Sequence, residues 1–123
     1  MTNILIADDD FISLEVLKAM LAQYAVTVHT AADGQAAVDT ALQVTPALII
    51  LDYEMPKLTG AEACKQLRQH AVFADTPIIA LTGHQSPTEI EACRAAGMNH
   101  TLHKPVSPDA LQDLFSTYLP ELL

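Results

Sequence analysis

Aromatic residues and cysteines are scarce in this sequence. It contains no Trp, three Tyr, three Phe and two Cys among 123 residues. Cys64 and Cys93 lie far apart and form no CxxC pattern, which argues against a disulfide-rich scaffold and a cysteine-based zinc motif. Because each lies in a segment with amphipathic helical periodicity, we expect both to be buried free thiols.

Positive charge is also scarce. Six Lys and Arg residues stand against fifteen Asp and Glu residues, which gives a net charge of −9. A surface of this sign is unsuited to neutralising nucleic-acid phosphates. We therefore expect no direct nucleic-acid binding.

Long hydrophobic runs are absent, although half of the residues are apolar. No uninterrupted run approaches the roughly 20 residues that span a bilayer, and the N-terminus lacks a basic region followed by an apolar core. We expect no membrane insertion and a cytoplasmic location. The length suits a single domain, residues 1–123, with a core of its own.

Short apolar segments alternate with amphipathic segments along the chain. The apolar segments are often β-branched and predict five strands. These strands are expected at Asn3 to Ala7, Val26 to Ala31, Ala47 to Leu51, Pro77 to Leu81 and His100 to His103. Helical periodicity predicts helices at Phe11 to Gln23, Gln35 to Val44, Gly60 to His70, Thr88 to Ala96 and Asp109 to Tyr118.

Residues typical of helix ends support these boundaries. Asp10, Asp33 and Ser107 suit N-caps, Pro108 suits a first helical position, and Gly97 suits a helix end. Near-continuous apolar strands with helical crossovers indicate a parallel sheet covered on both faces. We predict an α/β fold, a three-layer α/β/α sandwich of flavodoxin-like (βα)5 type with sheet order 2-1-3-4-5.

Polar residues gather at the carboxyl ends of the predicted strands. Asp8 and Asp9 follow the first strand, Asp52 the third, Thr82 the fourth and Lys104 the fifth. Ligands of open parallel sheets bind outside these ends, where the strand order reverses. The sequence therefore predicts a site at which three acids face one another, with Thr82 and Lys104 beyond Asp52.

Crowded carboxylates repel one another at neutral pH, and a hard divalent cation relieves that repulsion. Mg²⁺ prefers oxygen ligands and is commonly held by one or two carboxylates together with a phosphate. An aspartate can also attack phosphorus and form an acyl phosphate, a transfer that depends on positioning and charge neutralisation. Mg²⁺, Lys104 and the Thr82 hydroxyl could supply that neutralisation.

Four stretches carry these residues: ILIADDD, LIILDYEMPKLTG, IIALTGH and AAGMNHTLHKPV. In order and spacing they resemble the signatures of response-regulator receiver domains, and the resemblance covers essentially the whole chain. It implies a Mg²⁺-dependent signalling domain of two-component phosphorelays rather than a turnover enzyme. The last two stretches resemble receivers attached to hybrid sensor histidine kinases.

The resemblance also assigns roles to individual residues. It implies that Asp52 accepts the phosphoryl group, which Thr82 and Lys104 contact. It implies that Mg²⁺ is bound by Asp9, by Asp52, by the backbone carbonyl of Glu54 and, through water, by Asp8. The Lys104-Pro105 bond of the family is often cis.

The same resemblance implies the partners. A sensor histidine kinase or a histidine phosphotransfer domain would donate the phosphoryl group from a phosphohistidine. The signal would pass to an unidentified downstream protein through the face formed by the fourth helix, the fifth strand and the fifth helix.

The chain departs from the family pattern at Thr101. Receivers usually carry an aromatic residue there, three positions before the lysine, and its inward movement helps to remodel the signalling face. We expect the usual coupling between that position and Thr82 to be weakened. Glu54 and His84 flank the path of the attacking water and are expected to tune the lifetime of the acyl phosphate.

The histidines show no spacing typical of metal ligands, so we expect structural or surface roles for His29, His70, His84, His100 and His103. His103 adjoins Lys104 and could add pH sensitivity near the site.

Each site residue also has a plainer interpretation. The acids after the first strand can cap the first helix, which we favour for Asp10. Asp52 can form a turn, Thr82 can end a strand, and Lys104 can be a solvated charge. All of these plainer interpretations would have to be true at once, which would require several coincidences at the strand ends.

Two other function classes stay open. A Mg²⁺-dependent phosphohydrolase would also form an aspartyl phosphate, but its usual pattern has an Asp-x-Asp pair and an inserted cap, for which this chain has no room. A degenerate receiver used only for docking is conceivable because of Thr101. The complete set of Asp8, Asp9, Asp52, Thr82 and Lys104 argues against it.

Overall fold

Strand and helix alternate along the chain in the computed structural model, which describes residues 2–83 and 86–123. The strands are β1 (Thr2–Ala7), β2 (Val26–Ala31), β3 (Leu48–Asp52), β4 (Ile78–Thr82) and β5 (His100–His103). The helices are α1 (Phe11–Leu21), α2 (Gly34–Val44), α3 (Gly60–Leu67), α4 (Pro87–Ala95) and α5 (Pro108–Tyr118). Two short 3₁₀ helices, η1 (Ala71–Phe73) and η2 (Pro120–Leu122), complete the described chain.

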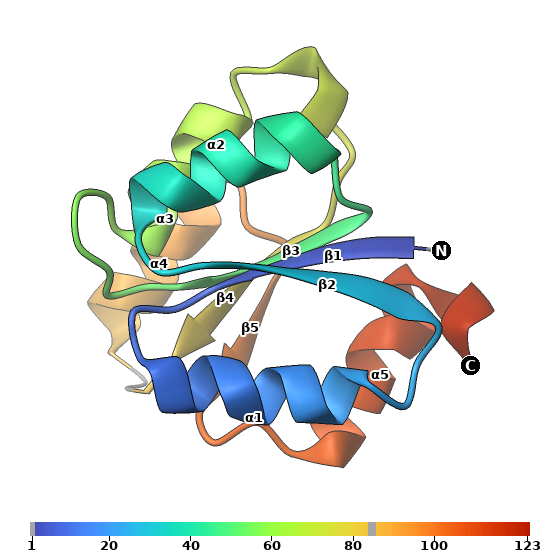
Figure 1. The fold of residues 1–123 in the computed structure, drawn as a ribbon. Helices are drawn as coiled ribbons and strands as arrows, with labels where there is room; N and C mark the ends of the chain where they lie inside the picture. Colours follow the sequence, from blue (N-terminus) through green and yellow to red (C-terminus); the bar gives the residue numbers. More distant parts are fainter. Residues whose placement is uncertain (1, 84–85) are drawn as a thin grey trace.

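The five strands form one parallel sheet in the order β2-β1-β3-β4-β5. Helices α2, α3 and α4 cover one face of the sheet, and α1 and α5 cover the other (Figure 1). This arrangement confirms the predicted three-layer α/β/α sandwich and its strand order. It makes β3 the central strand, with β1 and β4 as its neighbours.

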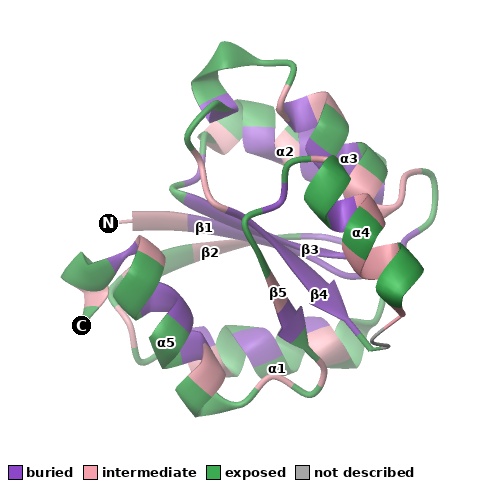
Figure 2. Cartoon of the chain, turned by 180° about the vertical axis from the view of Figure 1, so that it is seen from behind, coloured by how far each residue is buried: buried purple, intermediate pink, exposed green. Residues whose placement is uncertain are grey.

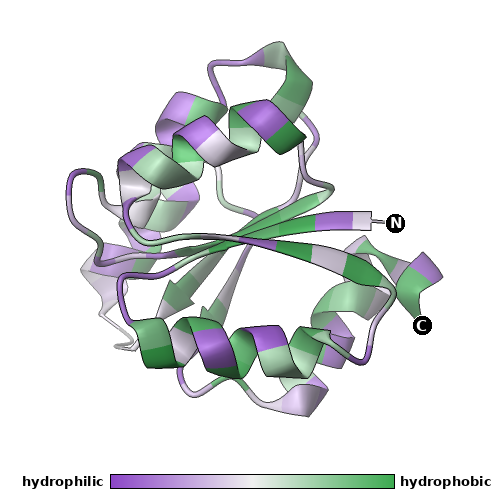
Figure 3. Cartoon of the chain, in the orientation of Figure 1, coloured by the Kyte–Doolittle hydropathy of each residue, from purple (hydrophilic) through white to green (hydrophobic). Residues whose placement is uncertain are grey.

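The sheet divides the core into two clusters. In β1, Leu5 packs toward α2 and α3, whereas Ile4 and Ile6 pack toward α1 and α5. Residues of β3 and β4 alternate in the same way, and both strands are buried along their whole length (Figure 2). The middle strands are therefore hydrophobic, while the helices carry polar residues on their outer sides (Figure 3). Burial on both faces explains why these strands are almost continuously apolar in sequence.

The side-chain caps that the sequence predicted are present, although α2 and α5 begin one residue earlier than predicted. Asp10 accepts a hydrogen bond from Ile12 N at 3.0 Å, and Asp33 and Ser107 cap α2 and α5 in the same way. Pro108 is the first residue of α5, and Gly97 follows α4 with φ of 101°. These N-caps satisfy amide groups that have no partner inside a helix.

The predicted ends of two helices were wrong by two and three residues. Helix α1 ends at Leu21 rather than Gln23, because Tyr24 N turns back to donate to the Leu21 carbonyl. Helix α3 ends at Leu67 rather than His70. The chain then enters η1, which the sequence did not predict. Strands β3 and β4 also lie one residue later than predicted.

Arg68 explains the end of α3. Its guanidinium group donates hydrogen bonds to the carbonyls of Phe73, Thr76 and Gly97 and to Asn99 Oδ1. One side chain thereby ties the end of α3 to η1 and to the turn between α4 and β5. The planar fork of arginine suits this arrangement of several acceptors.

Both cysteines are free and buried, as predicted, and lie in the core cluster between the sheet and helices α3 and α4. Over residues 2–83 and 86–123, no helix has the length and apolar character that crossing a membrane requires.

Candidate functional site

The central strand ends in a buried acid. Asp52 is the last residue of β3 and is 6% exposed, and Thr82, the last residue of β4, is 2% exposed. Asp8 follows β1 directly and is fully buried. The neighbouring strands of β3 therefore bring an acid and a hydroxyl to either side of Asp52.

The predicted acidic cluster is present. Carboxylate oxygens of Asp8, Asp9 and Asp52 lie within 4.8 Å of one another. Asp9 is exposed, whereas Asp8 and Asp52 are buried. Asp10, which the sequence analysis assigned to capping, caps α1, and its backbone amide donates to Asp8 Oδ1 at 3.0 Å.

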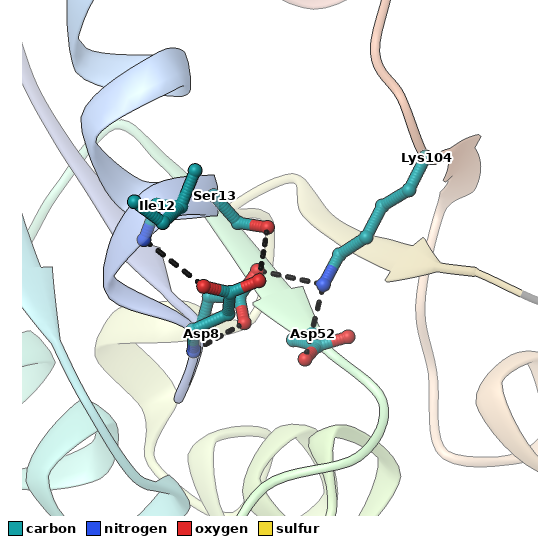
Figure 4. Close-up of polar contacts among 6 residues, drawn as sticks. Asp8, Ile12, Ser13, Asp52 and Lys104 are labelled. Carbon is teal, nitrogen blue, oxygen red and sulfur yellow. Dashed lines mark hydrogen bonds and ion pairs between the residues drawn. The ribbon is translucent and has the colours of Figure 1, made fainter.

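Lys104 reaches into this cluster from the residue after β5. Its Nζ lies 2.8 Å from Asp8 Oδ2 and 3.4 Å from Asp52 Oδ2 (Figure 4). Its backbone amide donates to the Thr82 carbonyl at 2.8 Å, and the Lys104-Pro105 peptide bond is cis. The lysine is thus tied to both β4 and the acids, and it is not an ordinary solvated charge.

The crowding shifts two pKa values. Burial, reinforced by the charge of Asp8, raises the pKa of Asp52 to about 7, and Lys104 opposes this shift. Burial alone would lower the pKa of Lys104, but its contacts with Asp8 and Asp52 outweigh that effect and raise it. Without a further cation, Asp52 is poised to hold a proton near neutral pH.

The donor set fits a hard divalent cation. Three carboxylates converge, and the buried Asp8 Oδ2 has the Lys104 ammonium, at 2.8 Å, as its polar partner among the described residues. Mg²⁺ takes oxygen ligands of this kind and keeps several waters. The exposed Asp9 would leave such an ion accessible to water and to phosphate oxygens.

A cleft of about 260 Å³ opens beside these groups. It is lined by Asp9, Asp10, Asp52, Tyr53, Glu54, Thr82, Gly83, Glu89 and Lys104. Glu54 therefore borders the site, as predicted, although its carboxylate is not part of the acidic cluster. His84 lies outside the described residues.

Sequence analysis missed Tyr53 and Glu89. Glu89 lies in the first turn of α4, and an acid in a first helical turn is common for local reasons. Only the position of α4 at this edge of the sheet identifies it as a lining residue.

The Thr82 hydroxyl lies on the β5 side of β4. Thr82 pairs with His103 in the sheet register, and Thr82 Oγ1 lies 3.4 Å from His103 Nδ1. Thr101, at which the sequence analysis noted a departure from the receiver pattern, pairs with Ala80.

Known proteins are similar to this chain in sequence and in fold. The response regulator receiver domain family matches residues 4–116. The transcription factor SKN7 of Saccharomyces cerevisiae is 32% identical over 97% of this chain and 19% of its own length. The signal transduction histidine-protein kinase BarA of Escherichia coli K12 is 32% identical over 96% of this chain and 13% of its own. The chain thus spans less than a fifth of either relative.

A solved structure resembles this one over nearly its full length. The receiver domain of the sensor histidine kinase PA1611 from Pseudomonas aeruginosa PAO1 superposes with a TM-score of 0.90 and is 32% identical, with coverage of 97% of this chain and 98% of that chain. That structure has a magnesium ion coordinated in its active site cleft. The match to the receiver family over residues 4–116, together with this fold and the acidic cluster, shows that the chain belongs to the response-regulator receiver domains of two-component signalling, whose general function is Mg²⁺-dependent phosphoryl transfer to an aspartate.

Proposed function

We propose that Asp52 is the phosphoacceptor of this receiver domain. The observation that carries the proposal is the position of Asp52 at the end of the central strand, 3.4 Å from Lys104 and within an acidic cluster that borders an open cleft. In the transfer, an Asp52 oxygen forms a bond to phosphorus, and the phosphorus–nitrogen bond of a phosphohistidine breaks. The electron pair of that bond leaves with the imidazole nitrogen.

Asp9 and Asp52 would hold Mg²⁺ directly, with the backbone carbonyl of Glu54, and Asp8 would act through water. The bound ion would neutralise charge on the phosphoryl oxygens and the carboxylates. The raised pKa of Asp52, about 7, supports this assignment. A cation in the cluster favours the ionised carboxylate, which is the nucleophile.

Lys104 and Thr82 would contact the transferred group. Lys104 already lies between Asp8 and Asp52, so its ammonium can exchange a carboxylate contact for a phosphoryl oxygen. Thr82 lines the same cleft, and its hydroxyl can donate to another phosphoryl oxygen once it faces Asp52. Both contacts stabilise charge on the group as it is transferred and after it is bound.

The relatives support the class of donor. BarA is a histidine kinase, and the matched PA1611 receiver comes from a sensor histidine kinase. A sensor histidine kinase or a histidine phosphotransfer domain would therefore supply the phosphoryl group. We place the exchange in the cytoplasm, where the sequence analysis expects the chain.

Residues 1–123 would act as one receiver domain that signals through protein contact and not as a turnover enzyme. The cleft of about 260 Å³ is bordered by acids and has no cap domain over it among the described residues, which suits a transferred phosphoryl group better than an enclosed small substrate. The face of α4, β5 and α5 would contact an unidentified downstream protein. The net charge of −9 supports a protein partner over a nucleic acid.

The test is covalent labelling of the intact protein. It is incubated with Mg²⁺ and a small acyl phosphate, and intact mass is measured for one added phosphoryl group. We expect a Mg²⁺-dependent adduct that is lost in Asp52→Asn and kept in Asp113→Asn, which removes an exposed acid of α5. Folded protein with an active donor and no adduct would refute the assignment. Continuous release of phosphate at many turnovers per chain would indicate a phosphohydrolase instead.

A further inference from the structure

The contact between Thr82 and His103 is not part of the function proposed above. The two residues are register partners on neighbouring parallel strands, so their side chains project from the same face of the sheet. Thr82 Oγ1 and His103 Nδ1 are 3.4 Å apart. Thr82 is buried and His103 is exposed, so the pair joins the interior of the site to the surface of the molecule.

This contact directs the Thr82 hydroxyl toward β5, whereas Asp52 lies on the other side of β4. Strand β4 lies between β3, which carries Asp52, and β5, which carries His103. A phosphoryl group on Asp52 would lie on the β3 side of Thr82. A hydroxyl carries a single proton and cannot donate to a phosphoryl oxygen and to His103 at once.

We propose that His103 is a positioning residue that holds the Thr82 hydroxyl on the β5 side in the resting protein and releases it when Asp52 is phosphorylated. The proposal rests on the phosphoacceptor role of Asp52. It requires the neutral tautomer protonated on Nε2, in which Nδ1 accepts the hydroxyl proton, because a ring that donated from Nδ1 would leave that proton free for the phosphoryl group.

The register explains why His103 and not Thr101 makes this contact. Thr101 projects from the same face but pairs with Ala80, two residues before Thr82, and its side chain is short. His103 is directly opposite Thr82 and carries a ring that reaches the hydroxyl. The chain therefore keeps a link between β5 and Thr82 although it lacks the aromatic residue.

His103 also reaches the outer surface. It borders a shallow groove of about 370 Å³ along β5 and the start of α5, together with Thr101, Pro105 and Ser107. Release of Thr82 would free the ring at this surface. The contact thus connects the charge at Asp52 to a side chain that a partner protein can touch.

The test measures the rate of phosphorylation by a small acyl phosphate at saturating Mg²⁺ in five proteins: the wild type, His103→Leu, His103→Asn, Thr82→Val and the double variant that combines Thr82→Val with His103→Leu. His103→Leu removes the ring nitrogen and is expected to speed phosphorylation about twofold to fivefold, the worth of one weak neutral hydrogen bond. His103→Asn places an amide atom where Nδ1 lies and is expected to restore the slower rate. In a Thr82→Val background, which has no hydroxyl to hold, His103→Leu should leave the rate unchanged.

A spectroscopic measurement tests the contact between Thr82 and His103 independently of the phosphorylation of Asp52. The ¹⁵N signals of the His103 ring are recorded in the resting protein and in Thr82→Val, and we expect Nδ1 to shift when the hydroxyl is removed. The inference is overturned if Nδ1 does not move, if His103→Leu leaves the rate unchanged, if His103→Asn behaves as His103→Leu, or if the effect of His103→Leu persists in Thr82→Val. If the wild-type protein takes up no phosphoryl group at all, the proposed function fails, and the ring signal still tests the contact by itself.

Discussion

Lys104 Nζ lies 2.8 Å from Asp8 Oδ2, closer than it lies to any oxygen of Asp52. The lysine follows the edge strand β5 and the acid follows β1, so the ion pair spans the carboxyl ends of β3 and β4. Only 25% of the Lys104 side chain and 1% of the Asp8 side chain are exposed. In the absence of a metal, Lys104 compensates one of the carboxylate charges at the site.

Lys104→Met is expected to destabilise the metal-free protein, because it leaves buried carboxylates without their cation. At pH 8 we expect the free energy of unfolding to fall by about 3–5 kcal/mol, as measured by urea unfolding with a chelator present. Mg²⁺ should recover part of the loss. Lys18→Met is the matched control, since the Lys18–Glu15 pair is about half exposed and is expected to contribute less than about 0.5 kcal/mol. Equal effects of the two changes would contradict this account.

Asp52→Asn is expected to stabilise the metal-free protein above neutral pH. The pKa of Asp52 is raised from 3.8 to about 7 by burial and by Asp8, so between these values the folded state binds more protons than the unfolded state. Its contribution to stability is therefore present below pH 3.8 and is lost as pH rises to about 7.

The asparagine variant should follow the wild type at pH 4 and exceed it by an amount on the order of 1–3 kcal/mol at pH 8. Thermal unfolding across this range measures the difference, with Asp113→Asn as a control for removal of an exposed charge. Mg²⁺ should narrow the gap by binding the wild-type carboxylate. A gap that stays constant with pH would show that Asp52 titrates as an ordinary exposed acid.

Arg68→Met is expected to lower the free energy of unfolding by about 2–4 kcal/mol, because four acceptors each lose a donor and two of them, the Thr76 and Gly97 carbonyls, lose the side chain that bonds them. These acceptors are the carbonyls of Phe73, Thr76 and Gly97 and the Asn99 side chain. Arg94→Met removes an arginine whose pair with Glu91 is mostly exposed, and it should change stability by less than about 0.5 kcal/mol. Urea unfolding of both variants tests the difference, and similar losses would argue against the role of Arg68.

Gly60→Ala is expected to destabilise the protein although alanine is the better helix former. A Cβ at Gly60 would lie 2.5 Å from the Asp52 carbonyl oxygen and 3.1 Å from Tyr53 Cα. We expect a loss of about 1–3 kcal/mol and slower phosphorylation, since the backbone of Asp52 must move. Gly83→Ala is the control for stability, because a Cβ there meets no described atom within 4 Å. Thermal unfolding that leaves Gly60→Ala as stable as the wild type would contradict the predicted clash.

The fold was predictable because its middle strands are covered on both faces. In β3 every residue is buried, and burial on both faces leaves a run of apolar residues that ends at the single acid Asp52. The strand ends then placed Asp8, Thr82 and Lys104 beside it. Capping by Asp10 and Asp33 was predictable for a similar reason, since a cap depends on residues two or three positions away.

The parts that were missed depend on contacts between distant segments. The end of α3 depends on Arg68, whose acceptors lie in η1, in the chain after it and beyond α4. The contact between Thr82 and His103 depends on the register of β4 and β5. The differing exposure of the adjacent acids Asp8 and Asp9 reflects the turn into α1. The local sequence pattern around these residues predicts none of these three features.

Because both cysteines are buried, the rate at which their thiols react would report on local opening of the structure around them. Burial raises the pKa of Cys64 to about 11 against the opposing charge of Arg68, and it raises the pKa of Cys93 as well. At neutral pH the reactive thiolate of Cys64 is then on the order of one molecule in ten thousand. Alkylating reagents would reach these sulfurs when α3 and α4 separate from the sheet. The rate of modification therefore measures how often these two helices open.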